Sequence, residues 1–333
     1  MKTERKSNIE LLRIISMLMV LTVHADGAAL GLPALHGNLA DATAYDLWRL
    51  AIESIAIIGV NCFTMISGYF GIRLRWRSAA AYLFQCAFYA VGIYTVLMLC
   101  FPGRLPLTGW AESWLVLTHT DLWYVPAYFG LMLLSPVLNA GLEALDKRQY
   151  TWLLAAFTLF NLWCGWWWQG SFNPTGYTLV QLILVYMTAR YIRLHVTPAS
   201  ISRRRPAITA VYLLSTMGIF VTSLYMEPTR AFAYNSPLVL ISTVSLFMLF
   251  TTLHIQSRGI NYAARSAFAA YLIHKSPLIW GNAMKPLMLR LAAALPGWQL
   301  AVAGAAVIIG FYLLAMAVDP LRRLISRALL QKA

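Results

Sequence analysis

Ten apolar segments follow one another along the chain, each close to the ~20 residues that a helix needs to cross a bilayer. Hydrophobic residues make up 60% of the 333 residues and charged residues only 11%, a balance outside the range of soluble domains. Because a backbone in lipid has to satisfy its own hydrogen bonds, these segments are predicted to be helices. Their approximate bounds are 8–28, 50–70, 79–101, 121–141, 151–168, 176–194, 207–226, 236–255, 265–284 and 299–319.

The Lys and Arg residues lie mostly in every second loop between these segments. With the N-terminus placed inside, 19 of the 26 Lys and Arg residues fall in inner segments and five in outer ones. Cytoplasmic loops of membrane proteins have such an excess. We therefore predict an all-α integral membrane protein with about ten transmembrane helices and both termini cytoplasmic. The net charge of +14 follows from these loops, so the predicted partner is the lipid bilayer and no nucleic acid.

No linker, low-complexity segment or internal repeat divides the chain. Residues 1–333 are therefore predicted to form a single transmembrane domain without a fused extracytoplasmic domain. Short loops around a compact set of spans favour a multi-pass protein of the bacterial inner membrane. The cysteines occur singly and without metal-ligand spacing, so we predict buried thiols and no metal site: Cys62, Cys86, Cys100 and Cys164.

Two ionisable residues, Arg13 and His24, lie in the first apolar segment. Eleven residues at about 100° each return the second side chain to within about 20° of the first, with a rise of roughly 16 Å. The two side chains therefore share one face of a helix, three turns apart. Ionisable groups inside a membrane span usually face a cavity or a partner, which indicates a functional site.

Other interpretations of this segment remain open. Arg13 could extend to the inner interface and pair with Glu10, three residues earlier, because such residues are neighbours on a helix. His24 could lie in the outer headgroup layer. A charged start followed by apolar residues also fits a cleaved secretory signal.

Several acidic residues are candidates for a partner of His24. Glu53 lies near the outer end of the second span, where it either orients and charges His24, as a carboxylate does for a catalytic imidazole, or is a solvated helix end. The first outer loop adds Asp26, Asp41 and Asp46.

Further features lie near the two mouths of the predicted bundle. Pro277 follows His274 and Lys275 within the ninth span, which predicts a broken helix of the kind that lines a cavity. Arg73 and Arg75 lie at the inner mouth, where they either bind phosphate or form an ordinary basic loop. The outer tryptophans fit an aromatic belt at the membrane interface or a platform for a sugar ring.

The opening Asn8–Arg13, with His24 ten residues beyond Arg13, resembles the membrane-bound acyltransferase-3 family, whose signature is Arg, ten residues and His on the first helix. Further stretches that resemble this family are Gly59–Phe70, Leu122–Tyr128, Asn235–Pro237 and Tyr271–His274.

The resemblance implies a ten-helix O-acyltransferase. It would move an acetyl group from cytoplasmic acetyl-CoA, as co-substrate, to a hydroxyl of a surface or lipid-linked carbohydrate at the outer side. Combined with the residue pattern, the resemblance implies that Arg13 binds the phosphates of CoA, with Arg73 or Arg75 as additional candidates. His24 would be a general base or would accept the acetyl group itself, and Glu53 or a loop acid would orient or charge His24.

Two other classes of function remain open on the sequence. A transporter or flippase for a lipid-linked glycan would use the same intramembrane charges as a substrate pathway. A non-catalytic membrane protein that organises polysaccharide assembly would tolerate exchange of Arg13 and His24.

Overall fold

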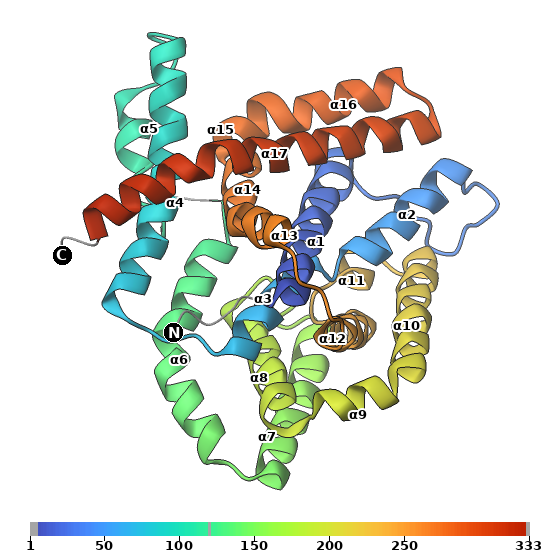
Figure 1. Cartoon of the computed structure of the whole chain (residues 1–333). Helices are drawn as coiled ribbons and strands as arrows, with labels where there is room; N and C mark the ends of the chain where they lie inside the picture. Colours follow the sequence, from blue (N-terminus) through green and yellow to red (C-terminus); the bar gives the residue numbers. More distant parts are fainter. Residues whose placement is uncertain (1–5, 119–120, 331–333) are drawn as a thin grey trace.

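In the computed structural model, residues 6–118 and 121–330 are described, and within these ranges the chain forms helices and no strand (Figure 1). Six helical stretches among these residues are long and apolar enough to cross a membrane. They are α1 (Ser7–Val23) with the π-helical turn His24–Ala28, α2 (Ala44–Ala56) with α3 (Gly59–Phe70), α4 (Trp76–Cys100), α6 (Tyr124–Ala144), α10 (Arg205–Tyr225) and α17 (Gly297–Leu330).

These six stretches coincide with the predicted first, second, third, fourth, seventh and tenth spans. The all-helical membrane class is therefore confirmed, whereas the count of ten and the side on which each terminus lies stay predictions. The fifth, sixth and eighth predicted spans also form helices, but these are not among the six that are both long and apolar enough. They are α7 (Lys147–Phe160) with the π-helical turn Asn161–Trp167, α8 (Leu179–His195) and α12 (Pro237–Thr251).

The ninth predicted span is interrupted, as the sequence predicts from Pro277. Helix α14 (Ala267–His274) ends at His274, and α15 (Pro277–Ile279) begins only after Lys275 and Ser276. Proline lacks an N–H group and clashes with the preceding turn, which breaks the helix at this point. The chain continues through the π-helical turn Trp280–Met284 into α16 (Lys285–Ala294).

Short helices connect the longer ones. They are α5 (Leu107–Glu112), α9 (Pro198–Arg203), α11 (Pro228–Ala231) and α13 (Arg258–Ala263), the last followed by the 3₁₀ turn Ala264–Ser266. Helix α1 lies at the centre of the molecule, where it packs against α2, α3, α12, α13, α14 and α17 (Figure 1). A helix in this position is part of the core, which argues against its removal as a secretory signal.

Asp319 joins α17 to the start of α14. Its fully buried carboxylate accepts hydrogen bonds from the Tyr89 hydroxyl at 3.0 Å, from Arg322 Nε at 2.7 Å and from the Ser266 hydroxyl at 3.4 Å. Buried charges require such partners, because an unpaired carboxylate in an apolar interior is costly. The contact with Ser266 ties down the turn from which α14 begins.

The cysteines are free thiols, and two of them are buried. The prediction of buried thiols holds for Cys62 and Cys86. It is wrong for Cys100, which is exposed, and for Cys164, which is only half-buried. Cys100 is the last residue of α4, and most of α4 lies on the outside of the bundle. An apolar segment therefore does not guarantee a buried thiol when lipid covers its surface.

Gly59 allows α3 to approach α1 closely. A Cβ atom at this position would lie 2.7 Å from the Ser16 carbonyl oxygen and 2.9 Å from Met19 Cβ. Both atoms belong to α1 near its backbone and cannot rotate away. Glycine is therefore required here for the packing of α3 on the helix that holds Arg13 and His24.

We expect Gly59→Ala to lower the free energy of unfolding by about 1–3 kcal/mol, because the added methyl group overpacks the contact between α1 and α3. The matched control is Gly92→Ala in α4, where a Cβ would meet no atom within 4 Å. Thermal unfolding of both variants in the same detergent measures the difference. Equal unfolding temperatures would contradict the close packing at Gly59.

Candidate active site

His24 and His274 form a hydrogen-bonded pair at the centre of the molecule. His24 is the first residue of the π-helical turn after α1, and His274 is the last residue of α14 before the break. His24 Nδ1 lies 2.7 Å from His274 Nε2. The helix break brings a second imidazole to the C-terminal end of α1, where π-helical turns are often associated with function.

The proton positions in this pair follow from a backbone carbonyl. His274 Nδ1 lies 2.6 Å from the Ala270 carbonyl oxygen, which can only accept, so Nδ1 carries the proton. His274 is fully buried and is expected to be neutral, which leaves a lone pair on Nε2. His24 Nδ1–H then donates to His274, and His24 Nε2 keeps a lone pair for a substrate.

Three cavities follow one another along α1. The His24 cavity, of about 550 Å³, adjoins the C-terminal end of α1 and includes Glu53, Trp123 and Lys275 in its lining. The waist is a narrow space of about 20 Å³ between the side chains of Met17, Val20 and their neighbours. His24 and Trp123 line both spaces, so the histidine lies at their boundary.

The Arg13 cavity, of about 230 Å³, lies at the other end of the waist. Phe63 and Phe268 line both spaces. The Arg13 cavity also contains Glu10, Ala264 and Arg265. Arg13 and His24 therefore lie at opposite ends of a row of three spaces. The face of α1 that carries both residues lines this row.

Arg13 pairs with Glu10, as the simpler interpretation of the sequence predicts. The Arg13 Nε atom lies 3.2 Å from a Glu10 carboxylate oxygen, and the guanidinium carbon lies 5.7 Å from the centre of the Phe63 ring. Both interpretations of Arg13 therefore hold in part, because the guanidinium pairs with Glu10 and also lines a cavity. A guanidinium group has five donors, so one bond to Glu10 leaves others for an anion.

Glu53 and His24 line the same cavity, but the partner of the His24 ring is His274. The predicted contact between the Glu53 carboxylate and His24 is therefore absent at His24 Nδ1, where His274 is the partner instead. Glu53 is 2% exposed, and its Oε2 atom is buried with no hydrogen-bond partner among the described residues. A catalytic role of Glu53 stays a prediction.

The loop acids have other partners. Asp26 pairs with Arg49 at 2.6 Å. Asp46 belongs to the capping box of α2, where its carboxylate accepts a hydrogen bond from the backbone N–H of the N-cap residue Thr43. Asp41 accepts a hydrogen bond from the side chain of Asn38. None of these contacts involves His24.

Arg265, not Arg73 or Arg75, is the second arginine of the Arg13 cavity. Its place in the 3₁₀ turn before α14 brings it to α1, which no local pattern indicates. Arg73 and Arg75 lie exposed in the turn between α3 and α4, so they do not line this cavity among the described residues.

A cluster of buried amide side chains supports the aromatic wall of the three spaces along α1. Asn61 Nδ2 and Gln181 Nε2 donate to the Tyr234 carbonyl oxygen at 2.8 and 2.9 Å, and Asn161 donates to Gln181 at 3.1 Å. Burial raises the pKa of the Tyr234 hydroxyl well above its usual range, so this group stays protonated. The Tyr234 ring lies 4.6 Å from that of Tyr177, which faces the His24 cavity.

A family model described as an acyltransferase domain matches residues 6–317. The chain belongs to the acyltransferase-3 family. It is therefore a membrane acyltransferase, and the match includes both Arg13 and His24. Comparisons with curated proteins and with solved structures gave no match.

We expect His274→Leu to lower the rate of acyl transfer by about 10²–10⁴-fold, because His24 loses the acceptor that sets its tautomer. His274→Gln should retain more activity, since its side-chain oxygen can accept from His24 Nδ1. The control is His254→Leu, at an exposed position between α12 and α13. Turnover of folded, purified variants distinguishes these cases, and equal rates for the two His274 variants would contradict the role of the hydrogen bond.

Proposed function

We propose that this protein is an O-acyltransferase of the bacterial inner membrane that crosses it with ten helices. It takes an acetyl group from cytoplasmic acetyl-CoA and transfers it to a hydroxyl of a surface or lipid-linked carbohydrate at the outer side. The observation that supports this proposal is the place of His24, between a cavity with two arginines and a larger cavity with an aromatic and polar lining.

The Arg13 cavity is suited to the phosphates of CoA. Arg13 and Arg265 supply guanidinium groups, which bind phosphate oxygens with paired hydrogen bonds. Arg73 and Arg75 would extend this basic surface on the predicted cytoplasmic side. The pantetheine arm would then pass through the waist toward His24.

The waist has to widen for this arm. Its volume of about 20 Å³ is close to the space that a single water molecule occupies. Phe63 and Phe268 stand at its entrance, and Met17 and Val20 line it. Rotation of such side chains is enough to open a passage for a thin chain, whereas a glycan would need the helices to separate.

Two routes of transfer fit the free nitrogen of His24. In the first, Nε2 takes the proton of the acceptor hydroxyl while its oxygen attacks the thioester carbon, the carbon–sulfur bond breaks, and the CoA sulfur receives the proton. In the second, Nε2 attacks the thioester carbon, the carbon–sulfur bond breaks, and CoA leaves as a thiolate. The acceptor oxygen then attacks the acetyl group, the bond to Nε2 breaks, and the hydroxyl proton passes to the CoA sulfur. In both routes, Glu53, which lines the same cavity, would orient or charge His24.

Purified protein in nanodiscs with radiolabelled acetyl-CoA and no acceptor tests the donor. We expect His24→Ala to bind acetyl-CoA and to release no CoA, because the reacting nitrogen is gone while the phosphate site remains. Label bound to the wild-type protein but not to His24→Ala would identify the covalent route. Wild-type protein that binds no acetyl-CoA yet moves a lipid-linked glycan would support the transporter instead.

A second prediction concerns the arginines. We expect Arg13→Ala and Arg265→Ala each to raise the Kd for acetyl-CoA by about tenfold or more, since each removes a charge-assisted contact to phosphate. The control is Arg104→Ala in the exposed segment after α4. Equilibrium binding measures the three constants, and an unchanged Kd for Arg265→Ala would remove this residue from the donor site.

A further inference from the structure

The His24 cavity has an unequal distribution of charged groups. Three carboxylates line it, from Glu53, Asp121 and Glu227, while Lys275 is its one Lys or Arg within the described ranges. The Lys275 ammonium lies 3.9 Å from the centre of the Trp280 ring, a cation–π contact that occupies part of its charge. Carboxylates therefore outnumber the Lys and Arg side chains of the lining, and one of them, Glu227, pairs with His36 at 3.1 Å.

Glu53 is the residue that indicates a ligand. Its side chain is almost fully buried, and the Oε2 atom has no partner among the described residues. Buried polar atoms without a partner are rare, because each loses its bonds to water and gains nothing in return. The carboxylate belongs to the lining of the cavity, so a donor group of a bound molecule can complete it.

Gly27 leaves room for this carboxylate. A Cβ atom at Gly27 would lie 3.1 Å from Glu53 Oε1, and Gly27 itself lines the cavity. The Glu53 side chain therefore lies close to the backbone of Gly27, which is about one helical turn beyond His24. A group bound to Glu53 would share the cavity with His24.

Aromatic rings form another part of the lining. The rings of Trp123 and Tyr177 lie 5.1 Å apart in an edge-to-face arrangement, and both line the cavity. Such rings pack against the apolar face of a sugar, and nearby acceptors bind its hydroxyl groups.

We propose that the His24 cavity selects an acceptor sugar without an acidic group, either neutral or amino-bearing, and that Glu53 binds a hydroxyl or ammonium donor next to the reacting hydroxyl. This inference rests on the proposed function and narrows its acceptor. A carboxylate on the acceptor has no hydrogen to donate to Glu53 Oε2, and it would approach the carboxylates of Asp121 and Glu227 in the same cavity. An ammonium group would pair with Glu53.

Three matched probes test the charge of the acceptor: methyl glucoside, methyl glucosaminide with its amine protonated, and methyl glucuronide. Isothermal titration calorimetry without acetyl-CoA measures binding, and CoA release from acetyl-CoA measures their use as acceptors. We expect the glucosaminide and the glucoside to bind at least about tenfold more tightly than the glucuronide.

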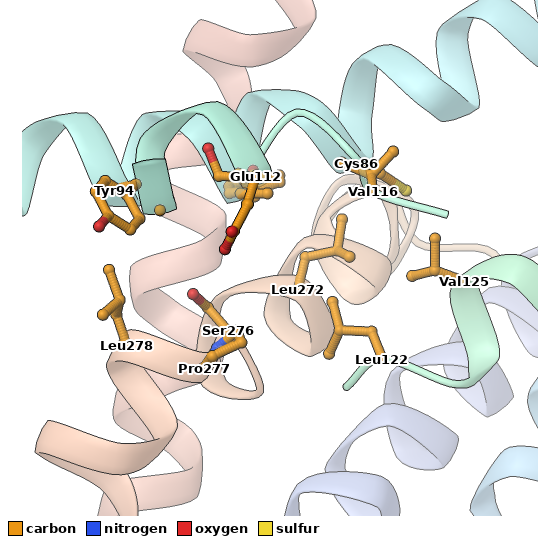
Figure 2. Close-up of a pocket in the computed structure, with 14 residues that line it drawn as sticks. Cys86, Tyr94, Glu112, Val116, Leu122, Val125, Leu272, Ser276, Pro277 and Leu278 are labelled. Atoms are coloured by element: carbon orange, nitrogen blue, oxygen red, sulfur yellow. The ribbon is translucent and has the colours of Figure 1, made fainter. Parts of the chain in front are cut away.

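Glu53→Gln tests the assigned residue, because it keeps the size of the side chain and removes its charge. We expect the ratio of glucosaminide to glucuronide affinity to fall by about tenfold in this variant. The matched control is Glu112→Gln, which should leave the ratio unchanged. Glu112 lines a separate cavity of about 210 Å³, where it points toward Ser276 (Figure 2).

Several results would overturn the inference. They are a glucuronide that binds as well as the glucoside, an unchanged ratio in Glu53→Gln, or no binding of any of the three probes. Because calorimetry is done without the donor, these results are independent of acetyl-CoA. A wild-type protein that binds the glucosides selectively but neither binds nor cleaves acetyl-CoA would support the inference about the cavity and overturn the proposed donor.

Discussion

The hydrogen bond between His24 and His274 joins residues 250 positions apart and leaves Nε2 as the free nitrogen of the His24 ring. The bond from His274 to the Ala270 carbonyl oxygen belongs to the last turn of α14, so it exists as long as that turn is helical. The backbone of one helix thereby determines the proton position on another. An imidazole serves this purpose well in an apolar interior, because it accepts a hydrogen bond without the cost of burying a carboxylate.

The helix breaks shortly after His274. Helix α14 ends at the level of His24, so that the second imidazole reaches the first. The next residue, Lys275, also lines the His24 cavity. The other end of α14 is held through Ser266 and Asp319, so the position of His274 depends on α4 and α17 as well.

Local patterns in the sequence predict the features that depend on one helix. Six spans, the interruption at Pro277 and the shared face of Arg13 and His24 follow from apolar length, proline chemistry and helical periodicity. The partners of these residues depend on contacts between distant helices, which periodicity does not contain. For this reason the sequence predicts Glu53 at the His24 ring and Arg73 or Arg75 beside Arg13, whereas His274 and Arg265 occupy those places. Both lie on α14 or the turn before it.

The narrow waist makes chemical sense for a protein that moves an acyl group and not a whole sugar. A channel wide enough for a glycan would also admit water and ions, and an open path would let both cross the membrane. A space of about 20 Å³, closed by Phe63, Phe268 and their neighbours, keeps the two cavities apart when no substrate is bound. Only an extended chain, such as the arm proposed here, would need to displace those side chains. Only the acetyl group would then pass from the donor on one side to the acceptor on the other, at His24 Nε2. The waist would stay closed to a whole sugar.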